Sequence, residues 1–404
     1  MSFKIINIVL LIFLFGISYG QQATCYAKSK IIKVYSISLK DSVSIELTLP
    51  LNYENEDNLP VIYVLDMQNS MNYKYNLSTI DYLSYFSVMP RSIVVGIEFN
   101  YKNRIPWTSP NLEGGKADDF SEFIINELDS LIGITEKRTD FNVLIGHSRT
   151  AIFAQYALSK YYNFFNASIA SCTAYFDFDK ENQKNEFEKF IMKSGELGSK
   201  RFLIYSSGTK INGDLHENSV DKFHYFIENK ELQGNIKTLY IKENNDHNSV
   251  PGLTVNRGLN FIFKDYQSCY WKIDNLLNSI DDIKVFPWDK IDEIYSKATL
   301  DLGFKITYDE LFFNSIGSRF YFGEEENSKE LAIEVLEKAI ENYPMDFGYY
   351  YWVGEVYLEL NRDELAEGFL IKALQIIEEN KALSAKIKTD EREYINELLK
   401  KVNK

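Results

Sequence analysis

The fold is decided by residues 142–151, which read NVLIGHSRTA. A short apolar run with β-branched residues ends at Gly146, and Ser148 follows two residues later. Residues 151–158 then have the apolar composition of a buried helix. The stretch therefore predicts a strand, a sharp turn and a helix in immediate succession.

A serine on such a turn is well placed to act as a nucleophile. In α/β hydrolases the turn lifts the serine hydroxyl clear of the sheet and leaves the next backbone N–H free to bind an oxyanion. Gly146 and Ser148 match the motif G-x-S-x-G, whereas Thr150 occupies the second glycine position. We expect the β-branched Thr150 to crowd the contact between helix and strand. A serine that only caps the N-terminus of a helix is the alternative interpretation.

The chain has the composition of a globular protein with two or three domains. Its 404 residues are 45% hydrophobic and 15% aromatic, which is ample for packed cores. The net charge of −14 and the lack of a Lys/Arg-rich run argue against nucleic acid or an anionic membrane as partner. Cys25, Cys172 and Cys269 allow one disulfide at most and lack metal-ligand spacing, so we expect no disulfide scaffold and no metal site.

Residues 1–20 have the pattern of a secretory signal peptide. Lys4 precedes an apolar stretch over residues 5–17, and the small residues Ser18 and Gly20 stand at the third and first positions before Gln21. This apolar stretch is shorter than the ~20 residues that a bilayer span requires. We expect cleavage before Gln21 and a secreted or periplasmic protein, with an uncleaved anchor as the alternative.

Strand and helix signals alternate over residues 31–268. Strands are expected at residues 31–38, 43–49, 60–66, 91–97, 142–146, 167–170, 201–206 and 238–241, and helices at residues 78–86, 118–132, 151–158, 220–227 and 253–263. Residues 99–115, rich in Asn, Pro and Ser, are expected to form a loop. Buried strands that alternate with helices predict a mostly parallel sheet with right-handed crossovers. We assign residues 21–268 to this α/β domain.

The chain has four histidines, so the candidates for a catalytic base are few. His147 lies inside the turn itself, and His224 falls in a helical pattern. His216 and His247 remain. His247 follows the last predicted strand and precedes a helix, where a base can reach the nucleophile, and we prefer it to His216.

The acid of a catalytic triad is expected after the strand at residues 201–206. Asp214 is preferred and Glu217 is the alternative, and both are expected in one loop with His216. Chemistry collects at the carboxyl ends of the strands in open α/β sheets. The chain order of serine, acid and histidine is also the order that α/β hydrolases use.

Four segments together resemble one family. Residues 60–66 are similar to its opening PVLYLLDG, residues 94–110 to VVGI.N..R..D.TP, residues 144–148 to the segment ending in GHS, and residues 246–263 to H.SVP…..GL.FIF. Residues ~30–266 thus resemble the putative esterase family of the α/β hydrolases, which includes esterase D and the siderophore, feruloyl and acetyl-xylan esterases. Three positions depart from its usual pattern: Met67 and Thr150 stand where glycine is usual, and Trp107 where aspartate is usual.

The resemblance implies a serine carboxylic ester hydrolase that works through an acyl-enzyme. Ser148 would attack the ester, His247 would move the proton, Asp214 or Glu217 would orient His247, and the backbone N–H of Arg149 with that of Met67 or Gln68 would hold the oxyanion. Neither a metal nor an organic cofactor is expected. Acetyl sugar esters, feruloyl esters, siderophores and acyl-glutathione relatives all fall within the resemblance, so the substrate is expected to be a small-molecule, carbohydrate or siderophore ester.

Residues 269–404 predict a small all-α domain with two repeats over about residues 310–380. Ala332, Leu336 and Ala339 recur 34 positions later as Ala366, Leu370 and Ala373, while Gly317 with Phe320 and Gly354 with Tyr357 occupy the small and aromatic positions of a tetratricopeptide repeat. Two repeats cannot cover their own terminal faces, so we expect docking on the α/β domain or a capping helix at residues 382–402. An ordinary helical bundle is the alternative.

A second function is consistent with the same features. An esterase-like scaffold with weak or no activity could bind a protein partner through the helical repeats. Thr150 and Trp107 motivate this hypothesis, whereas Ser148 and His247 argue for an active enzyme.

Overall fold

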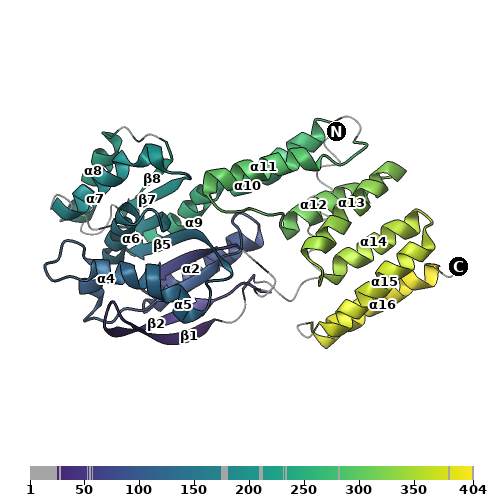
Figure 1. Cartoon of the computed structure of the whole chain (residues 1–404), viewed down its shortest axis with the longest axis horizontal. Helices are drawn as coiled ribbons and strands as arrows, with labels where there is room; N and C mark the ends of the chain where they lie inside the picture. The colour runs from purple at the N-terminus through teal and green to yellow at the C-terminus, as the bar shows by residue number, and fades with distance from the viewer. Residues whose placement is uncertain are drawn as a thin grey trace. The chain divides into compact units, whose positions relative to one another are not determined.

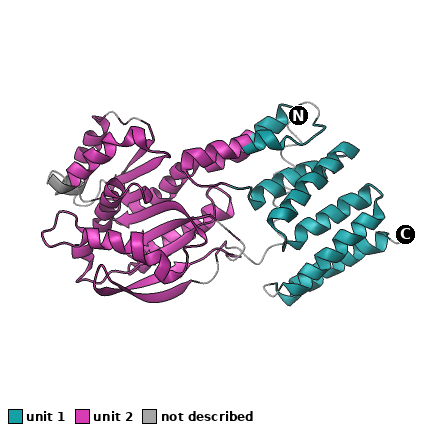
Figure 2. Ribbon diagram, viewed as in Figure 1, with its two compact units in different colours: residues 1–21, 273–292, 307–404 teal, residues 22–272, 293–306 magenta. Residues whose placement is uncertain are grey.

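The computed structural model describes residues 25–26, 29–51, 53, 56, 58–173, 181–208, 213–230, 232, 234–280, 283–380 and 383–402, with the side chains of residues 181, 182 and 213–216 left out. The predicted signal peptide lies outside these residues. The described chain forms two compact units (Figure 2). The first comprises residues 22–272 with residues 293–306, and the second comprises residues 273–292 with residues 307–404.

The first unit is built on an eight-stranded sheet in the order β1-β2-β4-β3-β5-β6-β7-β8 (Figure 1). Its strands are β1 (Lys30–Ser36), β2 (Asp41–Thr48), β3 (Leu59–Leu65), β4 (Ile93–Ile97), β5 (Arg138–His147), β6 (Phe165–Ser171), β7 (Arg201–Gly208) and β8 (Ile236–Glu243). β1 and β2 pair antiparallel with each other, and β2 pairs antiparallel with β4. All later pairs are parallel. The mostly parallel sheet that the sequence predicted is confirmed.

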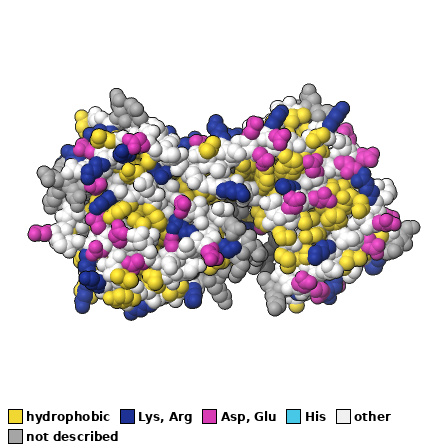
Figure 3. Space-filling view, in the orientation of Figure 1, with side chains coloured by type: hydrophobic (Ala, Val, Ile, Leu, Met, Phe, Trp, Pro, Cys, Tyr) yellow, Lys and Arg dark blue, Asp and Glu magenta, His cyan; other side chains and the backbone are white. Residues whose placement is uncertain are grey.

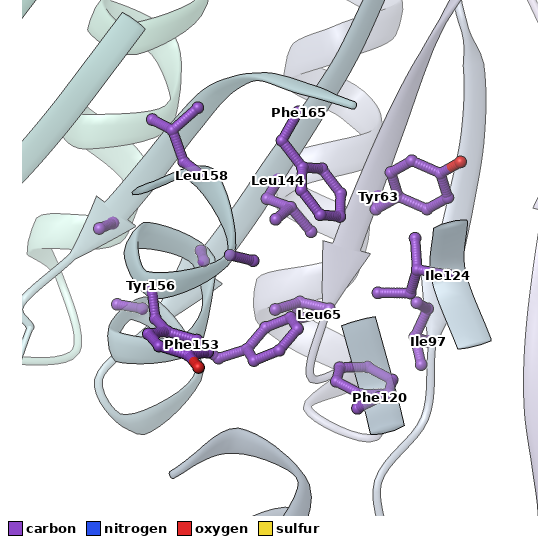
Figure 4. Packing of buried hydrophobic residues seen from close by; sticks show 14 of the residues in the cluster. Tyr63, Leu65, Ile97, Phe120, Ile124, Leu144, Phe153, Tyr156, Leu158 and Phe165 are labelled. Atoms are coloured by element: carbon purple, nitrogen blue, oxygen red, sulfur yellow. The ribbon is translucent and has the colours of Figure 1, made fainter. Parts of the chain in front are cut away.

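Helices cover both faces of this sheet, as is usual for parallel sheets. Successive side chains of a strand point to opposite faces, so each strand contributes to the packing on both. In β3, Val61, Tyr63 and Leu65 join the cluster that holds Phe120 and Phe153 (Figure 4). On the other face, the Cβ that an alanine would add at residue 258 would lie 2.9 Å from the Ile169 side chain, so a helix backbone rests directly on β6. Both faces are buried, which is why these strands read as nearly continuous apolar runs.

The helices of the first unit follow the predicted pattern with four differences, the first being a helix at Glu181–Met192 where none was predicted. They are α2 (Ser70–Tyr85), α3 (Arg104–Thr108), α4 (Ala117–Glu122), the π-helical turn η2 (Phe123–Leu128), α5 (Asp129–Ile132), α6 (Arg149–Lys160), α7 (Glu181–Met192), the 3₁₀ turn η3 (Ser194–Glu196), α8 (Gly213–Glu228) and α9 (Val250–Ile262). α2 begins eight residues before the predicted start at residue 78. The loop predicted at residues 99–115 contains α3. The loop predicted for residues 214–217 is wrong, because these residues form the first turn of α8, where an acidic side chain favours the helix.

The packing of Trp107 accounts for one departure from the family pattern, a tryptophan where aspartate is usual. Its ring stacks on Phe120 at 5.9 Å between centroids and meets Phe99 edge to face at 6.3 Å. The side chain is buried. A charged aspartate could not occupy this aromatic contact without a partner, so the tryptophan here belongs to the core.

Residues 293–306 pack within the first unit, although their helical periodicity resembles that of the second. The backbone N–H of Lys200 donates to the Asp301 carbonyl at 2.9 Å, and the Lys200 ammonium lies 3.2 Å from the Asp301 carboxylate. The Phe304 ring lies 4.9 Å from the ring of Phe141 on β5. The two helices α10 (Lys264–Asn278) and α11 (Trp288–Leu302) therefore each contribute residues to both units.

The second unit continues with paired helices. These are α12 (Glu310–Tyr321), α13 (Glu326–Asn342), α14 (Phe347–Glu359), α15 (Asp363–Glu379) and α16 (Ala385–Val402). One close contact occurs twice: a Cβ added at Gly317 would lie 2.9 Å from Leu336, and one added at Gly354 would lie 2.8 Å from Leu370. Glycine at these two positions lets each helix approach its partner closely, as the predicted repeat requires.

The last helix caps this array. Ile395 and Leu398 of α16 are buried in a cluster with Leu370 and Ile377 of α15. The final helix, one of the two alternatives expected at the end of the predicted repeats, is present at Ala385–Val402. Within the described chain, none of the helices is both long and apolar enough to cross a membrane.

Candidate active site

The strand-turn-helix predicted around Ser148 is present. β5 ends at His147 and α6 begins at Arg149, so Ser148 alone makes the turn, with φ 57° and ψ −110°. A non-glycine residue with positive φ costs of order 1–3 kcal/mol and persists only where its surroundings fix it. Here the Ser148 N–H donates to the Ser171 carbonyl at the end of β6, at 2.8 Å.

Gly146 is required for this turn. A Cβ at Gly146 would lie 2.5 Å from the backbone oxygen of Thr150, closer than real Cβ contacts allow. The first turn of α6 therefore rests directly on the backbone of β5. This close approach fixes the angle at which Ser148 is presented at the carboxyl end of the sheet.

Asp66 links the turn to two other segments. It follows β3 directly, is buried, and has a left-handed backbone with φ 64°. Arg104 of α3 donates Nε to Asp66 Oδ1 at 2.6 Å and Nη2 to Oδ2 at 2.8 Å. Gln68 Nε2 donates to Oδ1 at 2.7 Å, and Thr150 Oγ1 donates to Oδ2 at 2.6 Å. The bond to this carboxylate raises the pKa of Arg104, which keeps the guanidinium charged.

Thr150 is accommodated in the second glycine position. Its side chain is fully buried, its hydroxyl donates to Asp66, and the same oxygen accepts from the His147 N–H at 3.0 Å. The crowding that we expected is absent because the threonine side chain points to Asp66, whereas the tight contact with Gly146 involves only the Thr150 backbone. The hydroxyl therefore ties the turn at Ser148 to the loop after β3.

The three candidate oxyanion donors differ in their surroundings. The Met67 N–H donates to the Ile97 carbonyl at 3.0 Å, which takes it away from an oxyanion. The Gln68 side chain is held at both ends, since its Oε1 also accepts from the Phe99 N–H at 2.9 Å. Arg149 is the first residue of α6 and follows Ser148 directly. Gln68 and Arg149 remain as candidates whose N–H groups can face a substrate.

His247 lies against the turn at Ser148. Its ring centroid is 4.6 Å from that of His147, and His147 Nε2 is 2.9 Å from the His247 carbonyl oxygen. The preceding Asp246 shapes the loop, because its Oδ1 accepts from the N–H of Asn248 at 2.8 Å and of Ser249 at 3.0 Å. These backbone bonds hold the pKa of Asp246 below its usual range.

The ends of β6, β7 and β8 converge on this loop. A Cβ at Gly208, the last residue of β7, would lie 2.5 Å from the Asn245 carbonyl, so only glycine lets the loop after β8 come this close. Cys172, just after β6, is buried, and burial raises the pKa of its thiol to about 12. This thiol is therefore protonated and inert at neutral pH. The loop that carries His247 is positioned by the backbone of its neighbours.

The candidate acids have different positions. Glu217 pairs with Lys242 of β8 at 2.9 Å, so its carboxylate already has a cationic partner. Asp214 and the alternative base His216 belong to the first turn of α8, and their side chains lie outside the described part. His224, further along α8, has Nδ1 2.9 Å from the Tyr205 hydroxyl, which fits the structural role expected for it.

The linkage through Asp66 was missed by reasoning on catalytic residue types. Asp66 and Arg104 both fall inside segments that resemble the family, and this was the available signal. The contact of Asp66 with Thr150 joins residues 84 positions apart. Pairings of that range cannot be derived from the spacing of residues in one chain.

Comparison with known proteins agrees with this fold. A family model described as "Putative esterase" matches residues 36–252, more than half of the chain. A crystal structure of an uncharacterised protein from Capnocytophaga ochracea is 15% identical, covers 92% of this chain and 99% of its own, and has a TM-score of 0.59. An IroE-like serine hydrolase from Shewanella oneidensis is 20% identical, covers 76% of this chain and 98% of its own, with a TM-score of 0.59. Both share the fold. No curated protein sequence matches the chain.

Proposed function

Because the chain belongs to the putative esterase family, we propose that it is a secreted serine hydrolase that cleaves carboxylic esters through an acyl-enzyme. The observation that carries this proposal is the strained backbone of Ser148, with His247 held against the same turn. Strain of this kind is stored where function needs it. A serine that merely capped α6 would need no positive φ, and no side-chain capping bond from Ser148 accompanies it.

In the proposed reaction, Ser148 Oγ attacks the ester carbonyl while His247 accepts its proton. His247 then returns that proton to the leaving alcohol, and water releases the acyl group by the same route. The N–H groups of Arg149 and Gln68 would stabilise the oxyanion, a contribution of ~3 kcal/mol for each well-placed donor. The Asp66 linkage supports this role, because it fixes the Gln68 side chain relative to the turn.

We propose Asp214 as the acid that orients His247. Its place after β7 fits the order of the triad, and the rival Glu217 is already paired with Lys242. The Asp214→Asn variant is expected to slow turnover by orders of magnitude, whereas Glu217→Gln should leave it nearly unchanged. The reverse result would transfer the role to Glu217.

Hydrolysis of p-nitrophenyl acetate tests the assignment of the base. His247→Ala should lose nearly all turnover, and adding Ser148→Ala should hardly worsen it, because triad members act as a unit. His224→Gln is the matched control, since that histidine contacts Tyr205 and is expected to leave turnover near normal. Near-normal turnover in His247→Ala with loss in His216→Ala would refute our choice of base.

Secretion is a separate part of the proposal. The pattern of residues 1–20 supports removal of a signal peptide before Gln21. Amino-terminal sequencing of the mature protein from its native host should read QQATCY. A mature chain that still begins at Met1 would contradict secretion by this route without bearing on the chemistry.

The rival proposal, a binding protein without activity, loses its two sequence arguments. Trp107 packs in the core and Thr150 bonds to Asp66, so neither departure disturbs the turn. The helical repeats remain a candidate surface for a protein partner in addition to the ester substrate. An inactive scaffold would show no turnover of any ester, with or without Ser148.

A further inference from the structure

Arg149 places a guanidinium beside the proposed nucleophile. It follows Ser148 directly, and its partly buried side chain reaches across to the residue after α3, where Nη1 donates to the Ser109 hydroxyl at 3.2 Å. α3 also carries Arg104, which holds Asp66 next to the proposed oxyanion loop. The guanidinium of Arg149 therefore lies between the turn at Ser148 and Ser109, the residue that follows α3.

Arg149 differs from the other arginines because, among the described residues, its guanidinium bonds to neither a carboxylate nor a backbone carbonyl. Seven arginines within the described residues each pair with an Asp or Glu, as Arg104 does with Asp66 and Arg392 does with Glu378. The buried Arg201 donates to the backbone carbonyls of residues 162, 199 and 200 instead. For Arg149 the described chain supplies only the neutral hydroxyl of Ser109.

The missing carboxylate is notable because the protein is strongly acidic. It has 58 Asp and Glu residues against 44 Lys and Arg, and still none of the described carboxylates is in ion-pair contact with Arg149. A guanidinium presents five N–H donors in a planar fork that matches a carboxylate, and one hydroxyl uses a single donor. The remaining donors have no carboxylate partner among the described residues and are available to another group.

We infer that Arg149 binds an anionic group of the substrate, so that the enzyme prefers esters that carry a carboxylate or a similar anion. This inference rests on the proposed esterase function and names its substrate class. Arg104 is not placed to serve in this way, because its Nε and Nη2 already bind both carboxylate oxygens of Asp66. A charge-assisted, bidentate bond next to the reacting carbonyl would orient the ester as well as attract it.

Two pairs of esters test this inference. Mono-(4-nitrophenyl) adipate and 4-nitrophenyl heptanoate differ in the charge of the acyl arm, and 4-acetoxybenzoate and its methyl ester differ in the charge of the leaving arm. The measurement is the ratio of kcat/KM for the charged ester to kcat/KM for the neutral one. This ratio cancels any effect of a substitution at Arg149 on the steps that both esters share.

For at least one pair, Arg149→Met should lower this ratio about tenfold, the size expected for one charge-assisted contact in a partly exposed site. Arg149→Lys should retain part of the preference, because it keeps the charge but loses the planar fork. The wild-type ratio should also fall as salt rises to about 0.5 M, while that of Arg149→Met should not respond. Arg392→Met, which changes the net charge equally in the helical unit, should leave both ratios unchanged.

Unchanged ratios for both pairs in Arg149→Met would overturn the inference while leaving the esterase proposal intact. If the wild-type protein hydrolysed none of the four esters and its Ser148 did not react with a fluorophosphonate, the proposed function itself would fail. The two failures are therefore distinct.

Discussion

Two aspartates lie in the segments that follow strands β3 and β8, on opposite sides of the proposed active site, and they are held in different ways. Asp66, after β3, is buried and accepts four hydrogen bonds from Arg104, Gln68 and Thr150. Asp246, after β8, is partly exposed and accepts two bonds from the N–H groups that follow it, at Asn248 and Ser249. The first joins distant segments, whereas the second shapes one short loop.

Because of this difference, we expect substitutions at the two sites to affect the free energy of unfolding and the turnover rate differently. The turn at Ser148 is held by the buried, charged linkage through Asp66. Substitutions in this linkage should therefore lower the free energy of unfolding as well as the turnover rate. The base side rests on a local turn at the surface, so its substitutions should act mainly through the position of His247. The proposed proton transfer by His247 to substrate and water is better served by such a loop than by a rigid, fully buried one.

The largest effect is expected for Asp66→Asn. The amide cannot offset the charge of Arg104, and removing one partner of a largely buried ion pair costs ~3 kcal/mol. Urea unfolding should show this loss, and kcat should fall about tenfold because the Gln68 loop loses its anchor. Glu243→Gln is the matched control: it removes a carboxylate from the more exposed pair with Arg257 and should cost less than ~1 kcal/mol. Equal losses of unfolding free energy in Asp66→Asn and Glu243→Gln would show that the buried pair of Asp66 stabilises the fold no more than an exposed pair does.

A smaller effect is expected for Thr150→Val. Valine keeps the shape of threonine but cannot donate to Asp66 or accept from the His147 N–H, and leaving these buried groups without the hydroxyl costs ~1–2 kcal/mol. Thr150→Ser retains the hydroxyl and should recover most of the stability. If valine and serine behaved alike in urea unfolding, the hydroxyl would not be what ties the turn to Asp66.

The smallest effect is expected for Asp246→Ala. Loss of the two turn bonds should lower kcat, by no more than about fivefold, with KM little changed. Asp246→Asn should be milder, because an amide oxygen can accept the same two bonds. A loss as large as that in His247→Ala would mean that Asp246 itself takes part in the chemistry.

The pH dependence of this contribution follows from the lowered pKa of Asp246 in the folded protein. A depressed pKa adds stability above the pKa of the unfolded state, about 3.9 for aspartate, and this stability is lost as the pH falls through the folded value. The difference in melting temperature between wild type and Asp246→Ala should therefore be constant from pH 8 down to mildly acidic conditions and shrink only in strong acid. A difference that changed near neutral pH would point to another titrating group.

The same contrast explains what the sequence could predict. The turn at Ser148 and the loop of His247 depend on neighbouring residues, and both could be derived from short segments. The core strands could be predicted as well, because burial on both faces leaves a continuous apolar run such as residues 61–65. The contact of Asp66 with Thr150 could not, because nothing local records which distant hydroxyl meets a given carboxylate.

Helical periodicity had a similar limit. It marks an apolar face but not the neighbour that covers it, so the packing of Phe304 on Phe141 was hidden. The first turn of α8 was missed for another reason: residues 213–217 read GDLHE, a composition that suits a polar loop and the acidic start of a helix equally well. In the repeats, by contrast, Gly317 and Gly354 could be placed correctly, since their small size is needed at one position of each copy.

Labelling with a fluorophosphonate tests the proposal that Ser148 is a nucleophile activated by His247. Such a probe reacts with an activated serine and leaves ordinary hydroxyls unmodified. Mass spectrometry of peptides from the labelled wild-type protein should find one adduct, on the peptide that contains Ser148. Labelling should be absent in Ser148→Ala and slowed by orders of magnitude in His247→Ala. A wild-type protein that stays unlabelled would refute the assignment of Ser148 as the nucleophile. A labelling rate that does not change in His247→Ala would refute the assignment of His247 as its base.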